Sequence, residues 1–335
     1  MGWARGVVFL VSGVALLLAC RALSLGPETP EPGTPGAIPG FTRLTPGDRA
    51  MYAGPSWSPD GQRIVYSRAE FTLPSLNLRS SEIFALDLLS GDVVRLTENQ
   101  YEDRDPDWSP DGSQIIFVRI EPPRGTSTGT LRGRSLLMIV RPDGSGEQVV
   151  FECPRNCHSP DWSPDGEQIA FSTDMIWLIG ADGSGARKMD LREFGNALHP
   201  TWSSDGNRLA FYGEIGPFAP GLPHSPRGYL VMFDMESGED STLAEVYAFD
   251  PDWSPDGSSI LFSSYPSAAS DYSTLLMVPS QGGRPIRVIS ETLIADIFDP
   301  AWSPDAQRIV VAFGSPIQTS TLYLLDVAQY RDGGQ

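Results

Sequence analysis

The sequence predicts an all-β protein, a six-bladed β-propeller built from four-stranded antiparallel blades. An eight-residue stretch, which reads DPDWSPDG from Asp105 and again from Asp250, recurs six times with small changes. The tryptophans of the six copies are 51, 54, 40, 51 and 49 residues apart, a period typical of a propeller blade. The prolines and glycines fall mostly at turns between short apolar runs, which favours strands over helices. The copies begin at Gly54, Asp105, Ser159, His199, Asp250 and Asp299.

Residues 1–19 predict an export signal. Arg5 precedes an apolar run from Gly6 to Ala19, which is too short to span a bilayer comfortably but has the length of a secretory signal segment. The run ends in the sequence LLAC, which resembles the lipobox of bacterial lipoproteins and implies that Cys20 is lipidated after cleavage. The alternative is an ordinary signal, which would leave Cys20 as an unpaired thiol. We therefore expect a membrane-anchored lipoprotein on the extracytoplasmic side, periplasmic or at the cell surface.

Residues 20–40 predict a tether. Five prolines lie among Gly, Thr and Glu from Arg21 to Gly40, a composition that favours extended backbone over a packed core. At about 3.1 Å per residue this segment reaches up to roughly 60 Å from the bilayer.

The propeller is expected from residue 41 to 330, each repeat supplying four strands. The tryptophan lies in the first strand, Ser-Pro-Asp-Gly forms the turn, and an Ile-, Val- and Phe-rich second strand follows. The sixth repeat has no fourth strand of its own. The segment from Phe41 to Thr45 reads FTRLT and matches VVRLT, the fourth strand that begins at Val93. We therefore expect the N-terminal strand to complete the last blade and close the ring.

The Pro-x-Trp-Ser-Pro-Asp-Gly repeat, followed by an Ile-x-Phe strand, resembles the TolB-type, WD-like propeller repeat over residues 41–328. The resemblance implies the fold, which hosts many functions. TolB proteins bind partner proteins in the periplasm and carry an additional α/β domain ahead of the propeller, where this chain has a 20-residue linker. The wider family includes propeller domains of prolyl oligopeptidase-like enzymes and sugar-processing enzymes.

The residues before the motif proline are candidates for a ligand site at the channel mouth. They differ between blades while their neighbours repeat, and in a four-stranded meander they lie near the face that carries the loops between second and third strands. Three carboxylates and an imidazole around one opening suit a hard cation such as Ca²⁺, an ammonium group or an arginine. The alternative is that these residues only begin the first strand. The candidate residues are Asp105, His199, Asp250 and Asp299, with Asp105, Asp250 and Asp299 as the metal ligands.

The loops between second and third strands vary in length and are further candidates, because variable loops on a rigid scaffold are common binding elements. Their basic and aromatic side chains would meet a partner; the alternative is that they are solvated decoration. They are Arg124, Arg132, Arg134, Phe218, His224 and Arg227.

Cys153 and Cys157 flank three residues in a connection between blades. In an exported protein a disulfide is their expected state. Closing so short a loop removes little chain entropy, so the bond is expected to shape the chain locally.

Composition and motifs together favour a non-enzymatic binding scaffold. The formal net charge of −18 disfavours nucleic acid, which needs clustered Lys and Arg. The three histidines are not paired in sequence with a nucleophile or a metal-ligand spacing. We expect a monomer that presents its channel mouth and loops to a protein or peptide of the cell envelope. The alternatives are an envelope glycan-binding protein and a sugar- or lactone-processing enzyme.

Lipidation of Cys20 is directly testable. In cells given a palmitate analogue, the wild-type protein should incorporate the label. The Cys20→Ala variant should not, because it lacks the cysteine to which the lipid is attached. An unlabelled wild-type protein would contradict the anchor.

Overall fold

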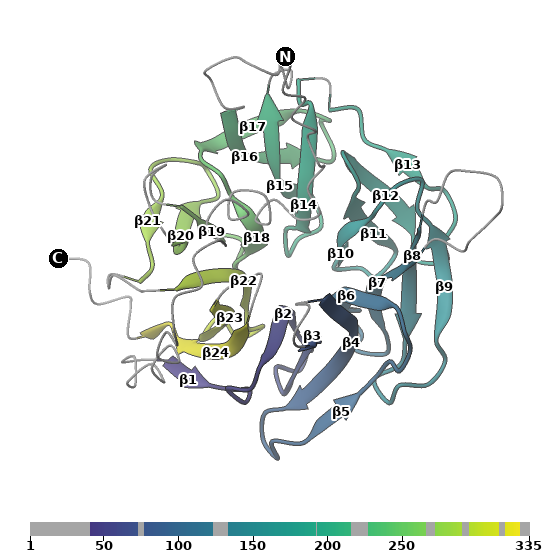
Figure 1. Cartoon of the computed structure of the whole chain (residues 1–335). Helices are drawn as coiled ribbons and strands as arrows, with labels where there is room; N and C mark the ends of the chain where they lie inside the picture. The colour runs from purple at the N-terminus through teal and green to yellow at the C-terminus, as the bar shows by residue number, and fades with distance from the viewer. Residues whose placement is uncertain are drawn as a thin grey trace, which may run out of the picture.

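The computed structural model describes residues 41–72, 77–122, 133–191, 193–215, 227–265, 272–289, 295–314 and 319–328. These residues form six four-stranded antiparallel sheets arranged as blades around a central axis (Figure 1). The six-bladed propeller predicted from the repeat is confirmed. Within the same ranges, no helix is long and apolar enough to cross a membrane.

The first three blades follow the chain from the centre outward, and their fourth strands lie at the rim. Blade 1 contains β2 (Ala50–Trp57), β3 (Arg63–Thr72), β4 (Asn77–Asp87) and β5 (Val93–Arg95). Blade 2 contains β6 (Glu102–Trp108), β7 (Ile115–Glu121), β8 (Arg134–Val140) and β9 (Gln148–Glu152). Blade 3 contains β10 (His158–Trp162), β11 (Gln168–Ser172), β12 (Ile176–Gly180) and β13 (Arg187–Lys188).

Blades 4 and 5 repeat this order, and blade 6 combines the two ends of the domain. Blade 4 contains β14 (Asn196–Trp202), β15 (Arg208–Ile215), β16 (Arg227–Asp234) and β17 (Asp240–Glu245). Blade 5 contains β18 (Phe249–Trp253), β19 (Ser259–Ser264), β20 (Thr274–Pro279) and β21 (Ile286–Arg287). Blade 6 contains β22 (Asp296–Trp302), β23 (Arg308–Gly314), β24 (Ser320–Asp326) and the N-terminal strand β1 (Phe41–Arg43).

Strand β1 closes the ring as the sequence predicts. It pairs antiparallel with β24, with Phe41 opposite Leu325 and Arg43 opposite Tyr323 (Figure 1). The pairing continues past the strand, since the Leu322 amide donates to Thr45 Oγ1 at 3.0 Å. The Phe41 ring also packs edge-on against Tyr323. The outer edge of blade 6 is therefore covered by the start of the domain.

The Ser-Pro-Asp-Gly turns are held by their own side chains. In blade 1 the Ser58 hydroxyl donates to Asp60 Oδ1 at 2.6 Å, and the Gln62 amide donates to the same oxygen at 3.0 Å. The Arg63 amide donates to Ser58 Oγ at 2.9 Å. The other five turns have the same serine–aspartate bond, so the motif aspartate is a turn residue. These aspartates are Asp60, Asp111, Asp165, Asp205, Asp256 and Asp305.

The hydrophobic core is divided among the seams between blades. Each buried cluster of the described residues joins two consecutive blades and contains one motif tryptophan, such as Trp108 packed with Val65 and Ile83 of blade 1. At three seams an arginine of one blade lies over the tryptophan of the next, for example Arg63 at 4.8 Å from the Trp108 ring centroid. The tryptophans are thus packing anchors between blades.

Among the described residues, a serine in or just before the third strand adds a polar link at four seams. Each serine side chain bonds backbone at or beside the next blade's first strand, as when the Tyr52 amide donates to Ser320 Oγ at 2.9 Å. The sequence analysis did not anticipate this link. The four serines are Ser81, Ser135, Ser273 and Ser320.

Closure by β1 makes its few residues important for the stability of the whole domain. Deleting residues 41–46 exposes the edge of β24 and removes the packing contacts of Phe41. We therefore expect the melting temperature to fall by more than about 5 °C. Deleting residues 21–40 instead should leave it nearly unchanged. Thermal unfolding followed by circular dichroism compares the two, and equal, mild effects would argue against closure by β1.

Candidate binding site at the central channel

The first strands of the six blades enclose a cavity of about 150 Å³ on the propeller axis. Each strand contributes the same three consecutive residues: the one before the motif proline, the proline, and the one after it. We name the first set the mouth ring and the last set the inner ring. The mouth ring is Gly54, Asp105, Ser159, His199, Asp250 and Asp299. The inner ring is Ser56, Asp107, Asp161, Thr201, Asp252 and Ala301.

All six mouth-ring residues have left-handed backbone, with φ between 46° and 57°. The register with the second strand shifts by one residue at each of these positions, so every first strand carries a β-bulge there. The following proline disfavours the right-handed helical conformation, and Asp and His are among the side chains that best tolerate a positive φ. Strained backbone held in the same place in every blade is often found at functional sites.

The mouth ring is linked by hydrogen bonds that cross from one blade to the next. The Gly54 amide donates to Asp299 Oδ2 at 2.7 Å, and the Ser159 amide donates to Asp105 Oδ2 at 3.1 Å. Across the next two seams, His199 Nδ1 lies 3.0 Å from Ser159 Oγ and 2.7 Å from Asp250 Oδ1. Across the remaining seam, between blades 5 and 6, Asp250 and Asp299 influence each other's ionisation.

The pKa directions in this ring favour protonation of Asp299 and of His199 and ionisation of Asp250. Burial raises the pKa of Asp299 well above its usual value, and the neighbouring charge of Asp250 raises it further. Burial lowers the pKa of His199, but the charges of Asp250 and Asp105 outweigh this effect and raise it overall. Burial raises the pKa of Asp250, yet the His199 charge and the bonds from Asp299 leave it lowered. Asp250 therefore carries the negative charge.

The inner ring contains three more carboxyl groups, each bonded to the tryptophan amide of the next blade. The Trp162 amide donates to Asp107 at 3.1 Å, the Trp202 amide to Asp161 at 2.7 Å, and the Trp302 amide to Asp252 at 2.6 Å. Burial raises the pKa of Asp107 to about 6 and that of Asp252 to about 7. Burial and the charge of Asp107 raise the pKa of Asp161 well above its usual value.

The inner ring was missed in the sequence analysis, although a signal for it exists. The residue after the motif proline differs between repeats, as the residue before the proline does, while the proline and the tryptophan beside it repeat. That position, between the motif proline and the motif tryptophan, is polar in five of the six repeats. The exception is Ala301.

The predicted calcium site is not assembled. In the described part of the chain, no three His, Cys, Asp or Glu side chains are arranged to hold one metal ion. Asp105, Asp250 and Asp299 direct their oxygens around the ring, to amides and to each other, rather than toward a common point. The raised pKa values of Asp299 and His199 both act to reduce the charge repulsion that suggested a cation.

Ser159, His199 and Asp250 lie together but do not form a hydrolase triad. A triad places the nucleophile and the carboxylate on opposite ring nitrogens, so that one can accept a proton while the other holds the ring. Here Ser159 Oγ and Asp250 Oδ1 both approach His199 Nδ1. A single ring nitrogen cannot donate a proton to Asp250 and accept one from Ser159 at the same time, so this geometry does not activate the serine.

Most of the predicted loop residues lie outside the described residues. This applies to Arg124, Arg132, Phe218 and His224, to the side chain of Arg227, and to the predicted lipidation site Cys20. Arg134 is described, at the start of β8. It forms ion pairs with Glu152 at 2.8 Å and Glu121 at 3.3 Å, so its charge is already balanced within blade 2.

Cys153 and Cys157 are joined by a disulfide at the seam between blades 2 and 3. Both cysteines are buried. The Cys157 amide donates to Ser135 Oγ at 3.0 Å, one of the serine links described above. The bond thus shapes the connection that enters blade 3.

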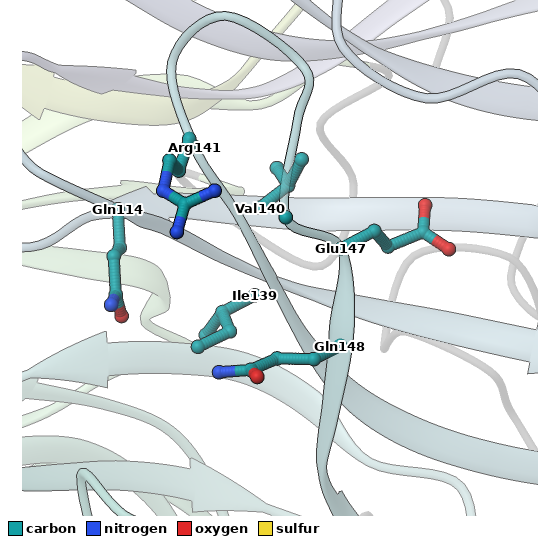
Figure 2. Close-up of a pocket in the computed structure, with 7 residues that line it drawn as sticks. Gln114, Ile139, Val140, Arg141, Glu147 and Gln148 are labelled. Atoms are coloured by element: carbon teal, nitrogen blue, oxygen red, sulfur yellow. The ribbon is translucent and has the colours of Figure 1, made fainter.

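A second cavity, of about 210 Å³, lies on blade 2 beside the turn between β8 and β9. Arg141 and Gln148 on its wall are exposed, and Figure 2 shows the Glu147 carboxylate pointing away from Gln114 and Arg141. Its polar groups therefore do not converge on one point. The channel, where β6 and β18 supply two aspartates each and β10 and β22 one each, is the stronger candidate.

Comparisons with known proteins agree with this fold. No family model matches the chain. Among curated proteins, it is 26% identical over 211 residues to an uncharacterized peptidase, YuxL, of Bacillus subtilis, covering 62% of this chain. The matched segment is 29% of that relative, and for two further relatives it is 42% and 23%, so the chain spans less than half the length of each.

Two solved structures illustrate the structural likeness. TolB from Acinetobacter baumannii superimposes with a TM-score of 0.53 at 17% identity, covering 75% of this chain and 57% of TolB. The chain has a TolB-like propeller fold. An oligogalacturonate lyase in complex with manganese superimposes with a TM-score of 0.50 at 18% identity, covering 85% of this chain and 92% of the lyase. At these identities the likeness extends to the fold alone.

The raised pKa of Asp252 predicts a pH-dependent stability. A carboxyl group that is harder to ionise in the folded state contributes stability below its unfolded pKa of about 4, which is lost as pH rises through about 7. In the Asp252→Asn variant, the side-chain amide keeps an acceptor for the Trp302 amide and cannot ionise. Between pH 4 and pH 8, the free energy of unfolding of Asp252→Asn relative to wild type should therefore rise by roughly 2–4 kcal/mol.

Asp305→Asn is the control for this series. The Ser303 hydrogen bond lowers the pKa of Asp305, so its contribution is lost only below about pH 4. The control should follow the wild-type profile from pH 4 to pH 8 in urea titrations. If Asp252→Asn follows it as well, Asp252 is ionised normally in the fold.

Proposed function

We propose that this protein is a non-enzymatic binding scaffold of the cell envelope that presents its channel mouth to a basic segment of a protein or peptide partner. The observation that carries the proposal is the channel itself, a cavity of about 150 Å³ lined by six aspartates. The formal net charge of the whole protein, −18, adds long-range attraction for a basic partner. The same charge disfavours nucleic acid.

The dimensions of the channel favour one inserted side chain over a complete small ligand. A volume of about 150 Å³ corresponds to roughly five water molecules, below the 300–1,000 Å³ or so of pockets that enclose drug-sized ligands. An arginine or lysine side chain fits this space and opposes the charge of Asp250. The rest of the partner then lies on the face of the propeller around the mouth.

Anchoring completes the proposal. Lipid at Cys20 would attach the protein to a membrane on the extracytoplasmic side, and the proline-rich segment of residues 21–40 would hold the propeller away from the lipid surface. In this arrangement the channel mouth meets partners at the cell envelope.

Binding rather than catalysis is supported by the arrangement of polar groups. The seryl, imidazole and carboxylate groups at the mouth converge on one ring nitrogen, which leaves the serine unactivated. The relative named as a peptidase shares only 29% of its length with this chain. Sugar or lactone processing is an outcome that the experiment below distinguishes from binding.

The proposal is tested with a peptide probe, an acetylated Gly-Arg-Gly amide, and its glutamine counterpart. The arginine peptide should raise the melting temperature of the wild-type protein, since a ligand that binds only the folded state stabilises it. Asp250→Asn should weaken binding by about 10-fold, equivalent to about 1.4 kcal/mol. Asp256→Asn, in the turn at the other end of the same strand, should bind as the wild type does. Isothermal titration calorimetry gives the affinities.

Detergent-solubilised envelopes provide the physiological arm of the same test. Wild-type protein should retain an envelope protein that Asp250→Asn retains less. Equal retention by the wild-type protein and Asp250→Asn would indicate that the binding site lies in the loops. If no partner is recovered and the protein turns over a glycoside or lactone from a substrate panel, the protein is an enzyme and the scaffold assignment is wrong.

A further inference from the structure

At each seam the motif tryptophan of one blade meets the inner-ring residue of the blade before it. The tryptophan offers two donors, its backbone amide and its indole Nε1–H. The inner-ring residue offers its backbone carbonyl and, where it is polar, its side chain as acceptors. The six pairs, with the inner-ring residue first, are Ser56–Trp108, Asp107–Trp162, Asp161–Trp202, Thr201–Trp253, Asp252–Trp302 and Ala301–Trp57.

At four seams the tryptophan amide is bonded to the inner-ring side chain. The strongest example is the Trp302 amide, which donates to Asp252 Oδ2 at 2.6 Å, and the weakest is the Trp108 amide, 3.5 Å from Ser56 Oγ. We name this arrangement the side-chain link. In all four, the indole nitrogen is buried and has no hydrogen-bond partner among the described residues. These tryptophans are Trp108, Trp162, Trp202 and Trp302.

At the other two seams the indole is bonded instead. The Trp57 indole donates to the Ala301 carbonyl at 3.1 Å, and the Trp253 indole donates to the Thr201 carbonyl at 3.2 Å. Neither Ala301 nor Thr201 carries a carboxyl group. We name this arrangement the indole link. Among the described residues, no motif tryptophan forms both links.

This division indicates that the two links are alternatives for one seam. Both donors belong to one tryptophan and both acceptors to one residue, so the approach of one pair fixes the distance of the other. A buried N–H group without an acceptor costs about 1–3 kcal/mol, which the side-chain link leaves on the indole. Loss of the side-chain acceptor therefore favours the indole link, and the molecule contains both states in equivalent places.

The acceptors of the side-chain link are exposed to whatever enters the channel. Asp252 lies two residues after Asp250 on β18, and both line the cavity of about 150 Å³. A guanidinium group binds a carboxylate through two parallel hydrogen bonds, which occupy both oxygens. One of these is the Oδ2 atom to which the Trp302 amide donates. A guanidinium group and the Trp302 amide therefore compete for Asp252.

We propose that an arginine side chain in the channel draws Asp252 away from the Trp302 amide and converts the seam between blades 5 and 6 from the side-chain link to the indole link. The inference rests on the proposed function and adds a conformational response to it. In the converted seam, Trp302 Nε1 donates to the Asp252 carbonyl, as Trp253 Nε1 does to the Thr201 carbonyl.

The converted seam is part of the apolar core. Trp302 packs with Leu261 of blade 5 and Val311 of blade 6. Blade 6 also contains β1, so it holds both ends of the domain. Binding in the channel thus becomes coupled to the packing of blade 6 on blade 5.

Asp252→Ala tests the alternative links without a ligand, because it gives blade 5 the residue that blade 6 has at Ala301. In ¹H–¹⁵N spectra the Trp302 indole proton should move downfield, toward the signals of Trp57 and Trp253. Its exchange with solvent should slow by about 10-fold, equivalent to about 1.4 kcal/mol. Single Trp→Phe substitutions assign the signals.

Two further variants complete this arm. Asp252→Thr gives blade 5 the residue found at Thr201, and it serves if Asp252→Ala does not fold. Asp256→Ala is the matched control, since it removes an aspartate from the turn of the same blade. It should leave the Trp302 indole signal unchanged.

The ligand arm uses the acetylated Gly-Arg-Gly amide and its glutamine counterpart. Burial raises the pKa of Asp252 to about 7, so a titration at pH 8 keeps the carboxylate ionised. Saturation with the arginine peptide should move the wild-type Trp302 indole signal in the same direction as Asp252→Ala does. The Trp108 indole signal should not move, since its partner Ser56 has a neutral hydroxyl. The glutamine peptide should move neither.

The outcomes separate the conversion from the proposed function. An unchanged Trp302 indole signal in Asp252→Ala and Asp252→Thr means that the links are not alternatives, and it overturns the conversion. Calorimetric binding of the arginine peptide without a shift of the Trp302 signal also overturns the conversion, while the proposed function stands. Absence of peptide binding overturns both.

Discussion

The structure depends on one constraint: each blade must bond the next in the same direction until the sixth meets the first. The side chains of one blade reach the backbone of the following blade, as in the bonds from the Gly54 amide to Asp299 and from the Trp162 amide to Asp107. Such head-to-tail contacts form a closed ring only if the rotations between successive units add up to one full turn. Here it does so with six blades, and apolar packing around one tryptophan at each seam supplies the larger part of the attraction.

The six blades share the same packing, but their side chains in the mouth ring and the inner ring differ. These differences determine which polar and charged groups line the channel. Gly54 has no side chain with which to continue the mouth ring, and Ala301 has no polar group for the inner ring. Thr201 replaces a carboxylate in blade 4. The repeats differ at these inward positions while every repeat keeps its tryptophan and the serine–aspartate bond of its turn. A repeat protein can thus change the side chains around its central axis while it keeps the tryptophans that pack between its blades.

The fold was predictable because its defining features are local and recur in every repeat. The channel mouth was predictable for a related reason: Asp105, His199, Asp250 and Asp299 occupy equivalent places in their repeats. The directions of their oxygens were not predictable, since these depend on a bulge with left-handed backbone that turns each side chain toward its neighbour. For the same reason, and contrary to the calcium prediction, the described residues do not gather three ligand side chains around one metal ion. The inner ring had a signal in the sequence, a polar residue between the motif proline and tryptophan in five of the six repeats, which the sequence analysis did not use.

Closure by the N-terminal strand also determines when the fold can be completed. Phe41 pairs with Leu325, 284 positions later in the chain, whereas strands within one blade pair with their immediate successors. Contacts so distant in sequence form slowly, and this one cannot form until the last strand has been synthesised. At about 5–20 residues per second, that interval is roughly 15–60 seconds. During it, the earlier blades can assemble one after another while β1 remains without its partner and the edge of the forming ring stays open to other chains. The short, partly polar sequence of β1 suits that interval, because a three-residue strand offers little edge for another chain to pair with.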